Sequence, residues 1–247
     1  MYTTSCNFSQ SRPFILRECE GNPTDDGICP AFVACSEILH DFSESLGLAI
    51  DARDPRTMQH SKQVADISLI LSKAIGLDDD CAKTIHVAGH LHDIGKIATP
   101  DSILHKNGPL DEDEWARMRE HPVVGARIVA PVHLYRGRNS IHDCILHHHE
   151  RYDGKGYPAG LQGRDIPLGA RIIAVADTTS AMIQDRSYRQ GKTMPEVRAE
   201  ILNNVRTQFC PVVVKAFVSV VERIEAYLSQ DMNGISKLFA KFPVDGE

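Results

Sequence analysis

The sequence predicts an all-α fold. Apolar residues recur at helical spacing along most of the chain, and no segment of useful length alternates between apolar and polar residues. Residues that start or end helices, mainly Gly, Pro and Asp, stand between these amphipathic segments. No run of about 18 apolar residues is present, so no transmembrane helix is expected. With 247 residues, the chain is long enough for one large domain and a small appendage.

The first helices are predicted from their start and stop signals. Residues 1–29 lack periodicity, and we expect a loosely ordered segment there. Pro30 can open a helix, which apolar residues then extend to about residue 50. A second helix is expected from Asp54-Pro55 to Gly76, and a third from Asp78 to about Ile94.

The later helices follow the same reasoning. Helical spacing continues in six further segments, at residues 110–120, 123–130, 139–150, 169–184, 194–205 and 211–229. Residues 151–169 are punctuated by Gly and Pro and predict a long loop, with short pairing inside it as the only expected β structure.

Composition and charge exclude several classes of function. The formal net charge of −6 argues against polymeric nucleic acid as the main partner, because such binding needs a basic surface. The seven cysteines form no CxxC pair and are expected to be free thiols of a reducing compartment. The N-terminus has no signal-peptide pattern, so we expect a cytoplasmic protein without membrane insertion.

Histidine is the unusual component, since ten of the twelve lie between His86 and His149. Helical facing selects those that point inward. His60 and His92 each complete an otherwise apolar stripe, and Asp177 shares a face with Ile173. The other inward-facing candidates are Asp93, a quarter-turn from His92; His121, at a helix entrance before Pro122; and His148 and His149, which flank the stripe of Ile141 and Ile145.

The remaining histidines are expected to be ordinary structural residues. His86 and His90 are predicted to face the polar side of their helix, and His147 to face away from the inward stripe. A single inward histidine is usually a hydrogen-bonded core residue. Several unrelated buried polar sites would each need partners, however, whereas one metal cluster satisfies all of them. Asp93 is the natural bridge, because a carboxylate can hold two cations.

Two motifs stand in order along the chain, HLHDIGK at 90–96 and HHERYDGKGYP at 148–158. Together they resemble the HD-GYP subfamily of HD-superfamily metal-dependent phosphohydrolases, which are cyclic di-GMP phosphodiesterases. The resemblance covers roughly residues 50–225. It implies an HD-type helical bundle with a long GYP loop and an N-terminal helical extension. The implied organisation is an N-terminal segment with a regulatory or dimerisation role (1–49), the catalytic domain (50–229) and a C-terminal tail (230–247).

The resemblance also implies a binuclear metal centre. Asp93 would bridge two divalent ions. The implied ligands are His60, His92 and Asp177 on one ion, and His121, His148 and His149 on the other. A set of nitrogen and oxygen donors suits iron, manganese, nickel or zinc, and family usage points to iron or manganese.

The chemistry implied is phosphodiester hydrolysis by a hydroxide that bridges two metals about 3.5–4 Å apart. Catalytic roles fall on Asp93 and Lys96, since Lys96 can also reach a phosphate oxygen. The other residues expected to bind substrate are Arg186, Arg189, Gly156 and Tyr157. The product would be linear pGpG, with GMP as a further end product.

Two other functions stay open at this point. The chain can be a weakly catalytic sensor of cyclic dinucleotides, or a module that docks a diguanylate cyclase through the GYP loop. It can also be an HD hydrolase of another nucleotide. A homodimer is a further expected partner state.

Three positions depart from the family pattern. Ser180 stands where an Asp is usual, and Cys210 replaces the Asp of a Phe-Asp-Pro sequence. Some members hold a third ion on a Glu one turn before the first histidine, where this chain has Arg56. A guanidinium offers no lone pair to a cation. We therefore expect two ions per chain and no third ion next to the one at His60.

Overall fold

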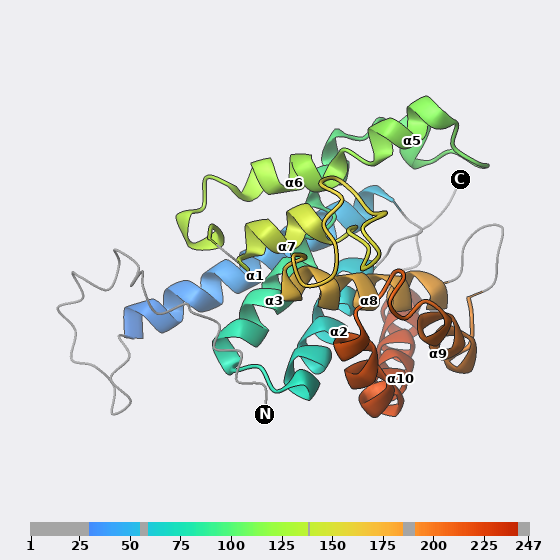
Figure 1. Ribbon diagram of the computed structural model, residues 1–247. Coiled ribbons are helices and arrows are strands. Elements are labelled where there is room, and N and C mark those ends of the chain that lie inside the picture. The colour runs from blue at the N-terminus through green and yellow to red at the C-terminus, as the bar shows by residue number, and fades with distance from the viewer. Residues whose placement is uncertain (1–29, 55–58, 138, 185–190, 242–247) are drawn as a thin grey trace.

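The computed structural model describes residues 30–54, 59–137, 139–184 and 191–241, with the side chains of 30–36 and 230–241 excepted. In this part of the chain the fold is all-α, as predicted (Figure 1). The only β pairing there is two isolated bridges, one of them inside the predicted loop. The elements are α1 (Pro30–Arg53), α2 (His60–Ile75), α3 (Asp79–Leu91), the 3-10 helix η3 (Ile94–Ala98), α4 (Asp101–Leu104), α5 (Glu112–Met118), α6 (His121–Val129), the 3-10 helix η4 (His133–Tyr135), α7 (Ile141–His147), α8 (Leu168–Ile183), α9 (Met194–Asn203) and α10 (Pro211–Lys241).

Local capping explains where several helices begin and end. Asp78 accepts a hydrogen bond from the Cys81 backbone N–H and so caps α3. Asp111 and Glu114 form a capping box at the start of α5. Gly76 ends α2 with a φ of 88°, a left-handed conformation that glycine adopts without strain. These ends agree with the start and stop signals of the sequence.

The core forms where α2, α3, α8 and α10 pack together. α2 contacts α3, α8 and α10, and α3 also contacts α1, α7 and α8. Figure 1 shows α8 at the centre of this arrangement. The predicted inward stripes are confirmed, since all their members are buried: His60, Val64, Ile67 and Leu71 on α2, and Cys81, Ile85, Ala88 and His92 on or just after α3.

α3 differs from the prediction in two respects. It ends at Leu91 rather than near Ile94, so that His92 and Asp93 lie in the turn between α3 and η3. The expected polar facing of His90 is wrong, because His90 is only 2% exposed. The reason is that α1 packs on α3 in addition to α2, so this helix buries more than one stripe.

The first and last helices extend beyond the predicted domain boundaries. α1 crosses the predicted boundary at residues 49 and 50, and α10 continues past the predicted helix end at 229 to Lys241. The proposed domain limits stay predictions. Cys81, Cys144 and Cys210 are buried. Within the described ranges, no helix is both long and apolar enough to cross a membrane.

Candidate metal centre

Six of the predicted ligands converge in two groups of three. His60, His92 and Asp177 form the first triad, and His121, His148 and His149 form the second triad. Within each triad the ligating atoms lie within 4.8 Å of one another. The triads contain the same residues that the sequence resemblance assigns to two separate ions. Their role as ligands stays a prediction.

Asp93 lies between the two triads and is 4% exposed. Its Oδ2 atom is 3.3 Å from His92 Nε2 and 3.9 Å from His60 Nε2, both in the first triad. Its Oδ1 atom is 3.3 Å from His121 Nε2 in the second triad. Each carboxylate oxygen therefore faces a different triad, which is the arrangement that a bridging ligand requires.

The histidines present lone pairs to this centre. Three of them place Nδ1 beside a carbonyl oxygen three residues earlier: His92 on Gly89 (2.8 Å), His121 on Met118 (2.8 Å) and His148 on Ile145 (2.7 Å). A carbonyl only accepts, so Nδ1 must carry the proton. In the neutral ring, Nε2 then holds a lone pair, which faces Asp93 in His92 and His121. These donors fit divalent ions held by nitrogen and oxygen atoms.

Burial keeps the second triad neutral. It lowers the pKa of His121 to about 3 and that of His149 to about 4, and it holds the pKa of His148 well below its usual value. At His92 burial also disfavours the charged ring, but the nearby Asp93 carboxylate outweighs it and raises the pKa of His92 to about 9. An ion that binds His92 must therefore displace a proton.

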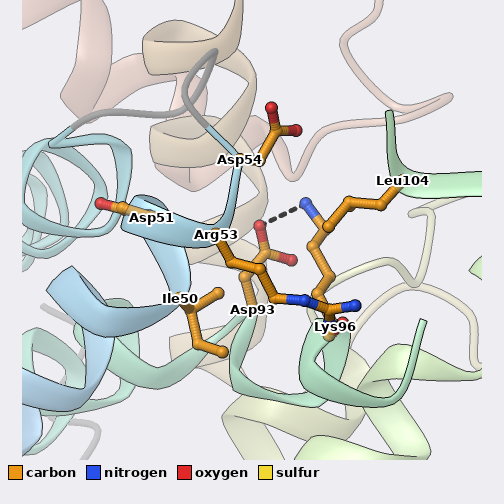
Figure 2. Close-up of a pocket in the computed structure, with 7 residues that line it drawn as sticks. All are labelled: Ile50, Asp51, Arg53, Asp54, Asp93, Lys96 and Leu104. Atoms are coloured by element: carbon orange, nitrogen blue, oxygen red, sulfur yellow. Dashed lines mark hydrogen bonds and ion pairs between the residues drawn. The ribbon is translucent and has the colours of Figure 1, made fainter. Parts of the chain in front are cut away.

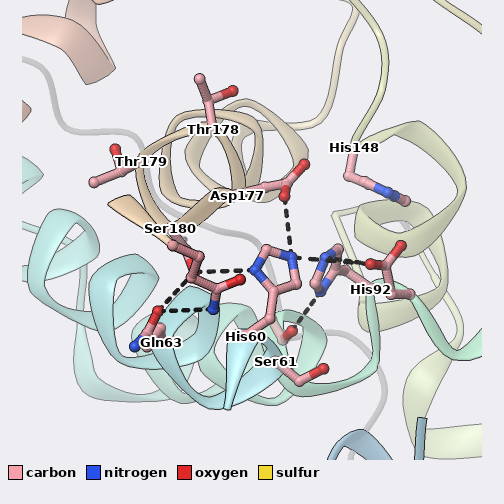
Figure 3. A network of polar contacts seen from close by, with 12 residues as sticks. His60, Ser61, Gln63, His92, His148, Asp177, Thr178, Thr179 and Ser180 are labelled. Carbon is pink, nitrogen blue, oxygen red and sulfur yellow. Dashed lines mark hydrogen bonds and ion pairs between the residues drawn. The ribbon is translucent and has the colours of Figure 1, made fainter. Parts of the chain in front are cut away.

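His60 is oriented by a hydroxyl rather than a carbonyl (Figure 3). Its Nε2 is 3.2 Å from Asp177 Oδ1, and its Nδ1 is 3.0 Å from Ser180 Oγ. Ser180 in turn donates to Gln63 Oε1 at 2.8 Å, so its own proton is committed and its oxygen accepts from His60. Ser180, where the family usually has Asp, therefore still fixes the His60 ring.

We expect Ser180→Ala to weaken metal binding at the first triad by about tenfold, because loss of an orienting partner typically has that effect. Metal titration of the purified variant measures it. The matched control is Thr178→Ala on the same helix, since the Thr178 hydroxyl donates to the Ala174 carbonyl of its own helix at 2.8 Å. Equal affinities of the two variants would show that Ser180 does not orient His60.

Lys96 lies beside the bridge. Its Nζ donates to Asp93 Oδ2 at 2.5 Å (Figure 2). Both groups border a small cavity of about 10 Å³ that Asp51, Arg53 and Asp54 also line. A volume of this size holds about one water molecule. The Lys96 ammonium group therefore lies at the centre. It can contact another negatively charged group there if it leaves Asp93.

Glu150 is a buried carboxylate near the centre that the sequence reasoning missed. It is 4% exposed, and its two carboxylate oxygens accept from the backbone N–H groups of Ala159 (2.7 Å) and Leu161 (3.1 Å). Glu150 thereby ties the glycine-rich loop, residues 151–167, to the end of α7. His147 Nδ1 lies 3.6 Å from the Glu150 carboxylate, so His147 faces away from the triads but supports this loop.

The loop places Gly156 and Tyr157 next to the second triad. A Cβ at Gly156 would come within 2.3 Å of the Arg151 backbone nitrogen, so the close approach requires glycine. The Tyr157 ring stacks on His149 with centroids 4.9 Å apart, and the Arg119 guanidinium lies 5.6 Å from the Tyr157 ring centroid. Tyr157 therefore forms a wall beside the second triad.

Three predicted residues, Arg56, Arg186 and Arg189, lie outside the described residues. The structure therefore does not bear on their expected roles.

Comparisons with known proteins identify related sequences. A family profile described as "HD domain" matches residues 45–211. The chain is 36% identical over 197 residues to a cyclic di-GMP phosphodiesterase of Thermotoga maritima, covering 78% of this chain and 52% of that protein. It is 40% identical over 148 residues to 3'3'-cGAMP-specific phosphodiesterase 1 of Vibrio cholerae, covering 60% and 34%.

A solved structure shares the fold. The cyclic GMP-AMP-specific phosphodiesterase V-cGAP3 of V. cholerae superposes with a TM-score of 0.60 at 19% identity, over 76% of this chain and 50% of that one. The chain spans about a third to a half of the length of the curated relatives it matches.

Proposed function

This chain belongs to the HD domain family, and on that premise we propose that it hydrolyses cyclic di-GMP to linear pGpG, with GMP as a further product. The observation that carries the proposal is the position of Asp93, with one oxygen toward each of two triads of ligands. Catalysis at this centre accounts for all seven side chains, whereas a docking module has no need of them. The names of the relatives support a cyclic dinucleotide as substrate.

The triads and Asp93 would hold two divalent ions, with iron or manganese as the first choice and nickel or zinc as the alternatives. Bound there, such ions supply an acidified water and neutralise phosphate charge. Asp93 keeps the two halves of the centre together. The histidine Nδ1 hydrogen bonds hold the imidazoles in one tautomer, so the ligand atoms are oriented before substrate arrives.

The protein groups around the centre would bind the phosphodiester. In the reaction, a water oxygen bonds to phosphorus, the bond to the ribose oxygen breaks, and that oxygen takes up a proton. The Lys96 ammonium moves from Asp93 to a non-bridging phosphate oxygen, where negative charge increases. Tyr157 and Gly156 form the wall on the His149 side, and Arg186 and Arg189 grip the second phosphate.

The experiment is anaerobic purification, metal analysis, and an assay with cyclic di-GMP, 3'3'-cGAMP and cyclic di-AMP. Two ions at the triads around Asp93 and turnover of cyclic di-GMP are the expected result. Preference for 3'3'-cGAMP would assign this chain to the second substrate that the relatives' names suggest. Binding of cyclic di-GMP without turnover at full metal content would establish the sensor instead.

Arg186→Ala should weaken cyclic di-GMP binding about tenfold to a hundredfold while both ions stay bound. The reason is the loss of a charge-assisted hydrogen bond worth about 1.5–3 kcal/mol. Isothermal titration with the nucleotide measures the effect, and Arg223→Ala, an exposed arginine of α10, is the control. If both variants bind like the unaltered chain, Arg186 does not contact substrate.

Docking of a diguanylate cyclase through the glycine-rich loop, a homodimer and a cytoplasmic location remain predictions. So does hydrolysis of a nucleotide outside the cyclic dinucleotides, against which the 148–158 motif argues.

A further inference from the structure

A third group of histidines converges outside the catalytic centre. His40 lies on α1, and His86 and His90 lie one turn apart on α3. The Nε2 atoms of His40 and His86 are 3.1 Å apart, and those of His86 and His90 are 3.2 Å apart. All three rings offer a ligating atom within 4.8 Å of the other two. His40 also lies before residue 45, where the match to the family begins.

The spacing of these nitrogens suits one metal ion. Zinc–nitrogen bonds of about 2.0–2.1 Å in a tetrahedral site place neighbouring nitrogens about 3.3 Å apart. The measured separations of 3.1 and 3.2 Å are close to this value. They also equal the spacing inside the second triad, where His121 Nε2 and His148 Nε2 are 3.2 Å apart.

Hydrogen bonding alone does not satisfy this arrangement. The Nε2 atom of His86 faces two other Nε2 atoms. An imidazole nitrogen carries either one proton or one lone pair, so it makes one good hydrogen bond and leaves the second contact unpaired. A cation accepts a lone pair from each of the three rings at once.

A carboxylate fixes the tautomer of one of the three rings. Asp41 Oδ1 is 3.2 Å from His40 Nδ1, which favours the proton there and leaves the lone pair on Nε2, as in carboxylate–histidine–zinc triads. Asp66 Oδ1 lies 3.8 Å from His86 Nδ1, too far for a hydrogen bond, and adds negative charge near the group. The nearby Lys62 ammonium is paired with Asp66 at 2.8 Å, which offsets its repulsion of a cation.

The burial of the three rings would hold two of them in place and leave the third open to solvent. His90 is 2% exposed and the His86 side chain 12%, whereas the His40 side chain is 36% exposed. The two rings on α3 are therefore held by packing, and the His40 ring has room to turn toward an ion. Its exposed side also leaves a fourth position for water.

We propose that His40, His86 and His90 bind one divalent ion of the zinc class, with water as the fourth ligand. Three imidazoles and no thiolate or ligating carboxylate are a donor set typical of zinc. The ion would fasten α1 to α3, next to the turn that carries His92 and Asp93. The expectation of two ions per chain then applies to the catalytic centre, and the whole chain takes three.

The test counts ions in the full-length chain with the catalytic centre disabled. In an Asp93→Ala background, zinc titration followed by gel filtration and metal analysis should give one equivalent. Adding His40→Ala should remove it, with at least about a tenfold loss of affinity. His133→Ala, which removes an exposed histidine, should retain it. The deciding readout is the difference of one zinc equivalent between the chains with and without His40→Ala. It does not depend on phosphodiesterase activity, so failure of the proposed function would leave it unaffected.

A second measurement guards against misfolding. Zinc should raise the melting temperature of the Asp93→Ala chain and not that of Asp93→Ala/His40→Ala, because an ion that binds only the folded state stabilises it. The far-ultraviolet circular dichroism of the two chains should be the same without zinc. Equal zinc content in the two chains, or an equal rise in melting temperature, would overturn the proposal.

Discussion

Asp93→Ala should abolish both phosphodiesterase activity and stable metal binding at the two triads. The Asp93 carboxylate is the only described side chain with one oxygen toward each triad. Removing it also deprives Lys96 of its directly paired carboxylate, beside the imidazoles. Turnover should fall at least about a thousandfold, since the nucleophile and the charge neutralisation are lost together.

Metal analysis after gel filtration, together with an assay on cyclic di-GMP, checks this expectation. His133→Ala is the control because its ring is exposed and outside all three histidine groups. His147 is unsuitable as a control, since it lies against the Glu150 carboxylate that anchors the loop. Retention of both ions at the triads and normal turnover in Asp93→Ala would show that Asp93 does not bridge.

Gly95→Ala should have the largest effect on stability. A Cβ at Gly95 would lie 1.9 Å from the His121 carbonyl oxygen and 2.5 Å from the Gly125 nitrogen. Both are backbone atoms of α6, so relief requires η3 and α6 to separate. We expect a loss of at least about 3 kcal/mol in the free energy of unfolding, at the upper end for overpacking, and weaker metal binding through displaced His121.

Urea denaturation monitored by circular dichroism measures the loss. Gly76→Ala provides the comparison, because a Cβ there meets nothing within 4 Å and only the φ of 88° is strained. That strain costs about 1–2 kcal/mol. Equal unfolding free energies for the two variants would mean that η3 and α6 can separate at little cost.

The fold was predictable where its signals are local. Asp78, Gly76 and the Asp111–Glu114 pair act on backbone groups within a few residues, so the sequence contains the whole interaction. The end of α3 was not predictable in this way. Helical spacing continues past Leu91, but the contacts that turn the chain there come from η3 packing on α6.

Part of the candidate centre was predictable from the sequence for a similar reason. The direction in which a histidine points can be predicted when it completes an apolar stripe of its own helix. This reasoning identified His60 and His92. The facing of His90 depends on α1, a partner that the stripe of α3 does not reveal. Glu150 was missed because its partners, Ala159 and Leu161, are backbone groups of a loop without periodicity. A buried carboxylate directly after two candidate ligands was the available signal.

The two triads draw on very different lengths of chain. The second triad comes from one stretch, residues 121–149, whereas the first needs His60 on α2 and Asp177 on α8. Closing the longer loop costs more conformational entropy, and α8 leaves the ribosome only after the second triad is already synthesised. The first triad therefore cannot be complete until α8 has been synthesised, whereas all three residues of the second triad precede α8 in the chain.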